Sequence, residues 1–494
     1  MEDFALSFPV RVPPSLLPRR AAALALAFAA LAGTALPAAA QTRDWLCAES
    51  QWTQASCWSA SATPLPASTE TAAILSGAAE LTGITTTVNQ LTLGNGMLKP
   101  NGDFGAVLRI YQGSLRAQTG NVIDGAWLMV DPFGTFANGL LVTSKANSLI
   151  TVSEFARLDV GPGGLLNQGA LSLKSTPGGP NVVVKDGGLV NGADDLGNVG
   201  TITVTGQYGG SAARIATAGF NQDGLLGIEA GAHLVVDNAD WSSRGRTELQ
   251  GVNASTGEPA RLDGSRLYLL NGGELAGGGH VGNAVTVIGG TLRPGAGQDL
   301  VLFGAVEVLG PGTIHVDGPA GARLFFYGNA SFNDSTFREI TGGGFTVFGR
   351  ELRLGTNPEA SRLAVRGGVA LQITSDLFMR LGEGGLSDAL SASNFLLLEG
   401  GRLTLTSLDG AELGIGETFQ LFPDTPLFFG SFGQIAFDEL SLASGARLDV
   451  SRLYLDGGLS VVAVPEPATW LSLGAGLLLI GARARRRLQS ARAT

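Results

Sequence analysis

A short unit recurs along most of this chain: an alternating apolar run, a corner that carries glycine, and a second alternating run. Examples pair residues 182–184 with 188–189, 267–269 with 273–275, 396–398 with 401–405, and 453–455 with 458–461. Alternation places every second side chain on one face of a strand, and glycine adopts the positive φ that turns the chain toward the next strand. Because one unit cannot bury its apolar face alone, neighbouring units have to stack.

Stacked units of this kind predict an all-β fold, with a right-handed parallel β-helix, a solenoid, over residues 41–463. Coils of about 20 residues that rise about 4.8 Å each would form a rod on the order of 90 Å long. The 73 glycines and the 44% of hydrophobic residues supply many corners and a core. The alternative is a set of β-sandwiches, because the Asn-Gly and Asp-Gly dipeptides typical of hairpin turns occur at 101–102, 124–125 and 186–187.

Residues 1–40 have the pattern of a secretory signal peptide. A positively charged segment is followed by an apolar run over 21–32, and Ala38 and Ala40 fit a cleavage site before Gln41. The apolar run is short for a membrane-spanning helix. We therefore expect an exported protein whose mature chain begins at Gln41.

The segment 464–494 combines three elements in a fixed order. Pro465, Glu466 and Pro467 come first, and the prolines interrupt regular structure. An apolar run over 468–482 follows, and it is closed by a basic cluster made of Arg483, Arg485, Arg486 and Arg487. A basic cluster after an apolar run stays on the cytoplasmic side, which predicts a transmembrane helix with the body of the chain outside the inner membrane. A helix of about 15 residues spans roughly 22 Å, which is short of a full hydrocarbon core.

This ordered trio resembles a PEP-CTERM sorting signal. The resemblance implies a partner, a membrane protease of the exosortase type, that recognises the motif and removes the helix. The protein would pass through the inner membrane transiently, and it would then reach the cell surface or the exopolysaccharide matrix of a Gram-negative bacterium. Exopolysaccharide is therefore a second candidate partner. The alternative is a permanent single-pass anchor.

Three segments of the body resemble autotransporter-like β-helix passengers. They are the opening with Trp52 and Cys57-Trp58-Ser59, the glycine-rich corners at 277–282 and 289–295, and the stretch 377–462. The similarity implies an architecture rather than an activity.

The chain contains two cysteines, Cys47 and Cys57, just past the predicted cleavage site. In an oxidising compartment they can form one disulfide that closes a small loop. A metal site would need further ligands, and no histidine lies nearby in the sequence.

Aromatic residues become frequent near 325–348. We interpret these residues as the filling of a widened core: Phe325, Phe326, Tyr327, Phe332, Phe337, Phe345 and Phe348. The alternative is an exposed platform on which sugar rings stack.

The sequence carries no pattern that we can assign to catalysis, so we expect no enzyme, no metal and no cofactor. His233, His280 and His315 are far apart in the sequence, and none has a partner at ligand spacing. The pair Asp194-Asp195 resembles that of polygalacturonase-like enzymes, but the other motifs of those enzymes do not follow it. The net charge of -10 argues against nucleic acid as a partner.

These observations predict a structural or adhesive surface protein. The alternative is a polysaccharide-active β-helix enzyme, a lyase or a hydrolase. For such an enzyme, carboxylates and arginines should converge on one face of the rod.

Overall fold

The computed structural model describes residues 41–490 apart from 61–63, 96, 98–102, 176–180, 185–186, 194–198, 207–211, 238, 319–320, 334–336, 357 and 465–466. The predicted signal peptide, the pair Asp194-Asp195, and Pro465 and Glu466 of the sorting motif lie outside the described residues.

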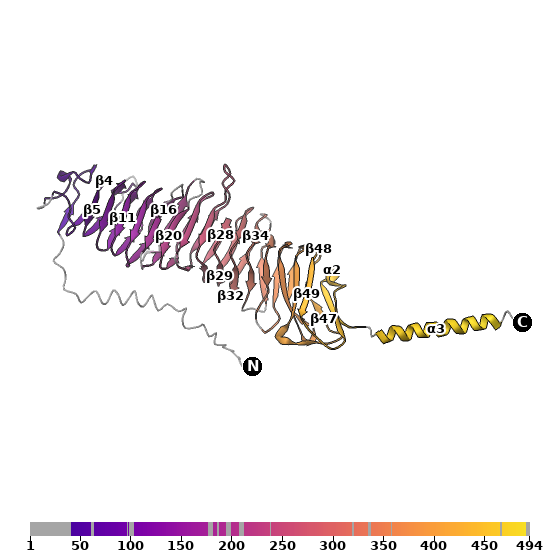
Figure 1. The fold of residues 1–494 in the computed structure, drawn as a ribbon. Helices are drawn as coiled ribbons and strands as arrows, with labels where there is room; N and C mark the ends of the chain where they lie inside the picture. Colours follow the sequence, from indigo (N-terminus) through magenta and orange to yellow (C-terminus); the bar gives the residue numbers. More distant parts are fainter. Residues whose placement is uncertain are drawn as a thin grey trace, which may run out of the picture.

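The described chain is all-β and consists mainly of large parallel sheets. Its strands form three ladders, and each coil of the chain contributes one strand to each ladder in turn. Figure 1 shows the strands side by side along a rod, in sequence order from β4 to β48. This arrangement is compatible with a β-helix.

The strands of the first ladder are β2 (Glu49–Gln51), β4 (Gly77–Thr82), β7 (Ala106–Tyr111), β10 (Ala126–Val130), β13 (Leu149–Val152), β16 (Ala170–Lys174), β19 (Thr201–Thr205), β22 (Leu225–Ile228), β25 (Arg246–Gln250), β28 (Glu274–Val281), β30 (Thr291–Pro294), β33 (Thr313–His315), β36 (Phe337–Thr341), β39 (Arg362–Val365) and β43 (Ala389–Ala392).

The strands of the second ladder are β5 (Thr85–Val88), β8 (Ser114–Ala117), β11 (Thr135–Asn138), β14 (Arg157–Val160), β17 (Asn181–Val184), β20 (Ala213–Thr217), β23 (His233–Asp237), β26 (Arg261–Gly264), the end of β28, β31 (Asp299–Leu302), β34 (Arg323–Phe326), β37 (Phe345–Phe348), β40 (Gly368–Leu371), β44 (Phe395–Glu399) and β48 (Phe428–Ser431).

The strands of the third ladder are β1 (Thr42–Asp44), β3 (Thr71–Ile74), β6 (Gln90–Leu93), β9 (Asn121–Ile123), β12 (Leu141–Ser144), β15 (Gly164–Asn167), β18 (Leu189–Asn191), β21 (Phe220–Gln222), β24 (Trp241–Ser243), β27 (Leu267–Leu269), β29 (Val285–Ile288), β32 (Val306–Leu309), β35 (Ala330–Phe332), β38 (Glu351–Arg353), β41 (Asp376–Gly382), β45 (Arg402–Ser407) and β49 (Gln434–Glu439), with β42 (Leu386–Ser387) antiparallel to β41.

The remaining elements lie toward the ends of the rod. They are η2 (Ala55–Cys57), η3 (Glu383–Gly385), η4 (Leu408–Gly410), the paired strands β46 (Glu412–Leu413) and β50 (Ser441–Leu442), the antiparallel strands β47 (Thr418–Gln420), β51 (Ala446–Asp449) and β52 (Gly458–Ala463), and the helices α2 (Leu453–Asp456) and α3 (Pro467–Ser490).

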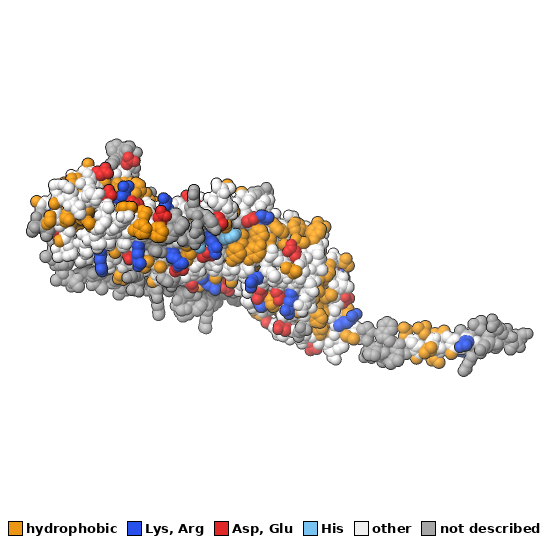
Figure 2. All heavy atoms as spheres, turned by 45° about the horizontal axis from the view of Figure 1, so that its top comes forward, with side chains coloured by type: hydrophobic (Ala, Val, Ile, Leu, Met, Phe, Trp, Pro, Cys, Tyr) orange, Lys and Arg blue, Asp and Glu red, His pale blue; other side chains and the backbone are white. Residues whose placement is uncertain are grey.

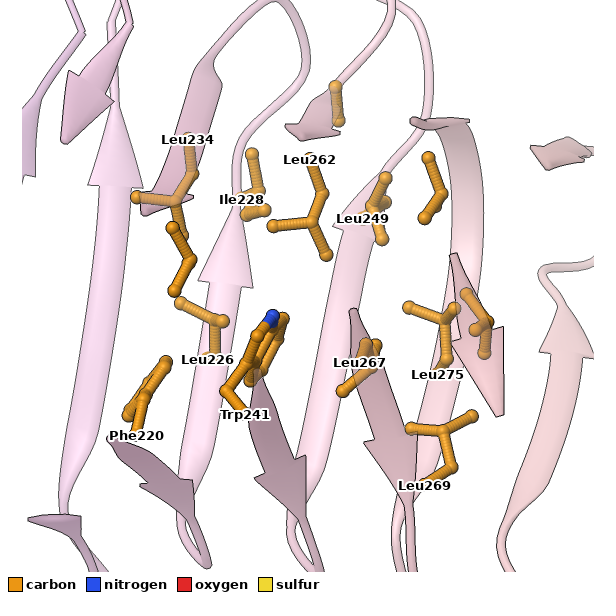
Figure 3. Packing of buried hydrophobic residues seen from close by; sticks show 14 of the residues in the cluster. Phe220, Leu226, Ile228, Leu234, Trp241, Leu249, Leu262, Leu267, Leu269 and Leu275 are labelled. Atoms are coloured by element: carbon orange, nitrogen blue, oxygen red, sulfur yellow. The ribbon is translucent and has the colours of Figure 1, made fainter. Parts of the chain in front are cut away.

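The core is a column of apolar side chains enclosed by the three ladders (Figure 3). Parallel pairing in register places equivalent side chains on top of each other. On the third ladder, Phe220 pairs with Trp241 and Trp241 pairs with Leu267. The rings of Phe220 and Trp241 stack with their centroids 5.1 Å apart. The alternation seen in the sequence therefore sorts side chains between the core and the surface.

A buried polar column accompanies the apolar one. Ser144, Asn167, Asn191, Gln222 and Ser243 follow each other in register on the third ladder, and each is 0% exposed. Asn167 Nδ2 donates to Asn191 Oδ1 at 2.7 Å, and Asn191 Nδ2 donates to Gln222 Oε1 at 2.8 Å. Because buried amides need partners, this column fixes the register of successive coils.

The two ends of the rod are closed differently. At the amino end, Trp45, Trp52 and Trp58 pack edge to face, with centroids 4.7 to 5.0 Å apart. At the carboxyl end, β47, β52 and β51 form a small antiparallel sheet; β47 precedes β48 and β49, the last strands of the parallel ladders, in the chain, and β51 and β52 follow them. Covering the terminal coils in this way protects strand edges that would otherwise pair with other chains.

We expected a transmembrane helix near the carboxyl end. Helix α3 projects beyond the rod in Figure 1 and is 24 residues long. Among the described residues, however, no helix combines the length and the apolar character needed to cross a membrane. Arg483 and Arg485 fall inside α3, so its apolar stretch is shorter than the helix itself.

Candidate binding face

From β31 onward, aromatic residues occupy several outward-facing positions on the strands of the second ladder or just after them. Because strand side chains alternate, Leu300 and Leu302 point into the core and Val301 points out. On the following coils, several of the residues in register with outward-facing residues of β31 are aromatic. We call this surface the aromatic face and define it as Phe303, Phe325, Tyr327, Phe345, Phe395 and Phe429. Figure 2 shows groups of hydrophobic side chains on the half of the rod toward α3, and also on the half toward the amino end.

Rings of the aromatic face contact each other within and between coils. Phe303 and Tyr327 stack at a centroid distance of 5.6 Å, and Tyr327 and Phe325 stack at 5.9 Å. Phe395 meets Phe429 edge to face at 6.0 Å. Phe303 is 50% exposed and Phe429 is 49% exposed. The rings thus form two contacting groups, one of Phe303, Tyr327 and Phe325 and the other of Phe345, Phe395 and Phe429. Grouped apolar side chains at the surface mark an interaction site more often than isolated apolar residues do.

A hollow of about 540 Å³ lies beside the first rings of this face. Its lining includes Phe303, Tyr327, Asn329, Arg350, Gln372 and Thr374. Gly349 forms part of the lining, and a Cβ there would lie 2.8 Å from both the Tyr327 ring and Gln372 Oε1. Thr374 donates its hydroxyl to the Gly349 carbonyl at 2.6 Å, which ties two neighbouring coils together under the hollow.

A polar cluster adjoins the aromatic face on its amino-terminal side. His233, Arg261 and His280 follow each other in register on the second ladder. Asp263 accepts hydrogen bonds from His233 Nε2 at 2.8 Å and from Arg261 Nε at 2.5 Å. His280 meets the ring of Phe303 edge to face at 5.2 Å, so the cluster and the aromatic face are continuous.

Two members of this cluster have shifted pKa values. Burial alone would raise the pKa of Asp263, but the hydrogen bonds from His233 and Arg261 outweigh burial and hold this pKa below 3.8. Burial, and then the positive charge of Arg261, lower the pKa of His280 below 6.5. At neutral pH, Asp263 is therefore ionised and His280 is neutral.

The cluster offers little to glycoside hydrolysis, which needs a pair of carboxyl groups in separate protonation states. Asp263 is the one carboxylate that bonds within the cluster, and its bonds to His233 and Arg261 keep it ionised. In the part of the chain that the structure describes, no group of three or more His, Cys, Asp or Glu side chains is placed to hold a metal ion.

Ion pairs between arginines and carboxylates are spread over many coils. Examples are Arg157 with Asp159, Arg214 with Asp237, Arg246 with Glu274, Arg323 with Asp299, and Arg366 with Glu339. In these five pairs the arginine meets a carboxylate on its own or an adjacent coil, and exposed pairs of this type contribute about 0 to 1 kcal/mol each. These pairs are distributed along the rod and balance charge locally.

The aromatic residues of 325–348, which we interpreted as filling of the core, differ in their burial. Phe326, Phe332 and Phe348 are buried in the core, as predicted. For Phe325, Tyr327 and Phe345 the prediction was wrong, because these side chains are only half-buried: Phe325 and Phe345 occupy outward positions on the second ladder, and Tyr327 follows the end of β34. The side chain of Phe337 lies outside the described residues.

The sequence analysis did not predict that His233 and His280 belong to one cluster, because the two residues are far apart in the sequence. Their ladder positions, with Arg261 between them, become visible only once the coil register is known. His315 lies on the first ladder instead, where its Nδ1 is 2.9 Å from Thr341 Oγ1.

Cys47 and Cys57 are joined in a disulfide, with their Cα atoms 5.0 Å apart. In the carboxyl-terminal segment, Pro467 is the first residue of α3, and Arg483, Arg485, Arg486 and Arg487 all lie within this helix. Gln41, the predicted first residue of the mature chain, is the first described residue and directly precedes β1.

Comparison with known proteins identifies one segment of the chain. Residues 463–487 match the family model of the PEP-CTERM protein-sorting motif. No curated protein and no solved structure matches the chain.

Proposed function

We propose that this chain is an exported, non-catalytic structural or adhesive protein of the bacterial cell surface or extracellular matrix. In this proposal, residues 41–463 form a right-handed parallel β-helix passenger, and an exosortase-type membrane protease processes the carboxyl-terminal signal. The match of residues 463–487 to the PEP-CTERM sorting motif carries the proposal. This motif is the sorting signal of the exosortase system of Gram-negative bacteria.

The architecture supports a structural role. The body of the chain is stiff, because it has three parallel ladders, a buried polar column and covered ends. Its surface repeats from coil to coil. Such a body presents side chains in columns, so a polymer that runs along the rod meets equivalent groups at regular intervals. The long surface suits adhesion to exopolysaccharide better than it suits the enclosed site of most enzymes.

The proposal is tested by mapping both termini of the protein recovered from its own cells. We expect an amino terminus at Gln41 and a carboxyl terminus upstream of α3. Recovery of a chain that still contains Trp470 and the basic cluster would show a permanent anchor. Recovery of a chain that retains residues 1–40 would contradict the predicted signal peptide.

The competing function, a polysaccharide lyase or hydrolase, is tested with the same purified protein. We expect no release of reducing ends or unsaturated sugars from bacterial polysaccharides. Release that disappears in both His280→Gln and Asp263→Asn variants would instead assign catalysis to the polar cluster.

A further inference from the structure

The hollow on the aromatic face combines two kinds of recognition group. Phe303 and Tyr327 provide apolar ring surface on one side, and Asn329, Arg350 and Gln372 provide polar tips around it. A pyranose ring has the matching character, since its C–H groups form an apolar patch and its hydroxyls form a polar rim. Sites of this type bind through contact with rings and achieve specificity through a few polar groups.

The aromatic face continues well beyond the hollow. It extends from the coil of β31 to the coil of β48, and the strands between them are β34, β37, β40 and β44. With about 4.8 Å between adjacent strands, these coils span about 24 Å along the rod. Phe345 and Phe395 lie at the start of their strands, and the hollow lies just past the strand ends. A polymer of sugars that enters the hollow can reach Phe345, Phe395 and Phe429 by crossing the second ladder diagonally.

The charge at the hollow selects among sugars. Arg350 is the only charged residue among the described residues that line it. Neighbouring arginines are engaged elsewhere, because Arg323 bonds both oxygens of Asp299 and Arg353 pairs with Glu351. The chain as a whole has a net charge of -10, so a site with a cation and without a carboxylate is a local exception. A guanidinium group pairs with a carboxylate through two parallel hydrogen bonds.

We propose that this hollow binds a carboxylated pyranose unit of an acidic polysaccharide. Phe303 and Tyr327 contact the sugar ring, Arg350 binds the carboxylate, and Asn329 and Gln372 bind hydroxyls. The aromatic face beyond the hollow contacts the neighbouring sugar units. The choice of a polysaccharide as the ligand rests on the proposed matrix function, whereas the preference for an acidic sugar rests on Arg350.

The test uses the exported protein purified from its own cells and two matched probes. One probe is oligogalacturonate, and the other is the same oligosaccharide with its carboxylates reduced to alcohols. We expect saturable binding of the acidic probe and about tenfold weaker binding of the reduced probe, because a charged hydrogen-bond pair is lost. Arg350→Gln should bind both probes equally, at the weaker level. Tyr327→Ala should weaken the binding of both probes.

Matched controls carry the same substitutions elsewhere on the rod. Arg293→Gln lies on the first ladder and Tyr268→Ala lies on the third, and neither residue is among those that line the hollow. Both should bind like the wild type, and circular dichroism should show the same β content for all variants. An absence of binding to the acidic probe, or a preference that survives Arg350→Gln, would overturn the proposal.

The alternative occupant of the face is a second copy of this chain. Sedimentation that showed dimers dissociated by Tyr327→Ala, together with no binding of either probe, would assign the face to self-association and overturn the glycan proposal. A protein with correctly processed termini that binds no acidic probe would refute this inference alone and leave the sorting function intact.

Discussion

Phe345 and Phe395 lie two coils apart on the second ladder, yet their ring centroids are only 5.7 Å apart. Gly368 pairs with both residues in the ladder and leaves the space that the two rings fill. A Cβ at Gly368 would lie 2.5 Å from Phe395 Cζ and 3.0 Å from Phe345 Cδ2. This glycine therefore shapes the aromatic face without being part of it.

The adjacent glycines 367 and 368 should respond differently to alanine. At Gly367, a Cβ would lie 1.9 Å from the carbonyl oxygen of Gly344, and backbone cannot move aside as a ring can. We expect Gly367→Ala to lower the free energy of unfolding by about 2 kcal/mol or more, and Gly368→Ala to lower it by less than about 1 kcal/mol. Urea denaturation of the two variants measures this order. Equal losses would show that the rings around Gly368 are as rigid as backbone.

Removing the disulfide should weaken the amino end without dissolving the rod. Replacing both Cys47 and Cys57 with Ser opens a loop with a sequence separation of 10, so the loss should be at most about 3 kcal/mol. The packing of Trp45, Trp52 and Trp58 remains to cover the first coil. Circular dichroism should be unchanged while tryptophan fluorescence reports a lower melting temperature. Loss of β structure along the whole chain would contradict this expectation.

His280 should make the protein less stable in mild acid. Its pKa in the folded chain is below 6.5, so the unfolded chain takes up the proton first as the pH falls. Stability should therefore be unaffected above pH 6.5 and should decline as the pH falls from 6.5 toward the folded pKa. Asp263 remains ionised throughout this range because its own pKa is lowered, so it does not contribute to the decline.

The measurement compares melting temperatures of the wild type and His280→Gln between about pH 8 and pH 5. Arg261 and Asp263, which act electrostatically on His280, are present in both proteins together with Glu258. The wild type should lose more stability than the variant as the pH falls. Parallel curves for the two proteins would show that His280 does not titrate differently on folding.

Much of the fold is contained in local sequence patterns. Alternation and glycine corners, as in 396–398 and 401–405, predict strands that stack, and β44 and β45 are found there. The Asp-Gly dipeptide at 124–125 is typical of a hairpin, but it joins β9 of the third ladder to β10 of the first. The dipeptide supplies a left-handed residue, Gly125 with φ of 62°, and such a residue turns a solenoid corner as readily as a hairpin.

The candidate binding face was harder to predict because it depends on register between coils. Whether Phe325 faces in or out is decided by a shift of one residue along the strand. Phe325 and Phe326 are adjacent aromatics, and both satisfy an apolar pattern, but only Phe326 is buried. The pairing of Arg261 with both His233 and His280 likewise depends on coil lengths, which vary along the chain.

The carboxyl-terminal signal should fail when its motif is changed. Glu466 is the charged group between two prolines in the sequence, and helix α3 begins at Pro467, the last residue of the motif. We expect Glu466→Ala, and separately the replacement of both Pro465 and Pro467 with Ala, to prevent processing and to retain the protein with the inner membrane fraction. Glu383→Ala, a change of an exposed glutamate in the body of the rod, should be processed and exported like the wild type. Fractionation followed by mass spectrometry of the carboxyl terminus distinguishes these outcomes. Normal processing of both motif variants would show that the protease reads the apolar run and the basic cluster rather than the Pro-Glu-Pro sequence.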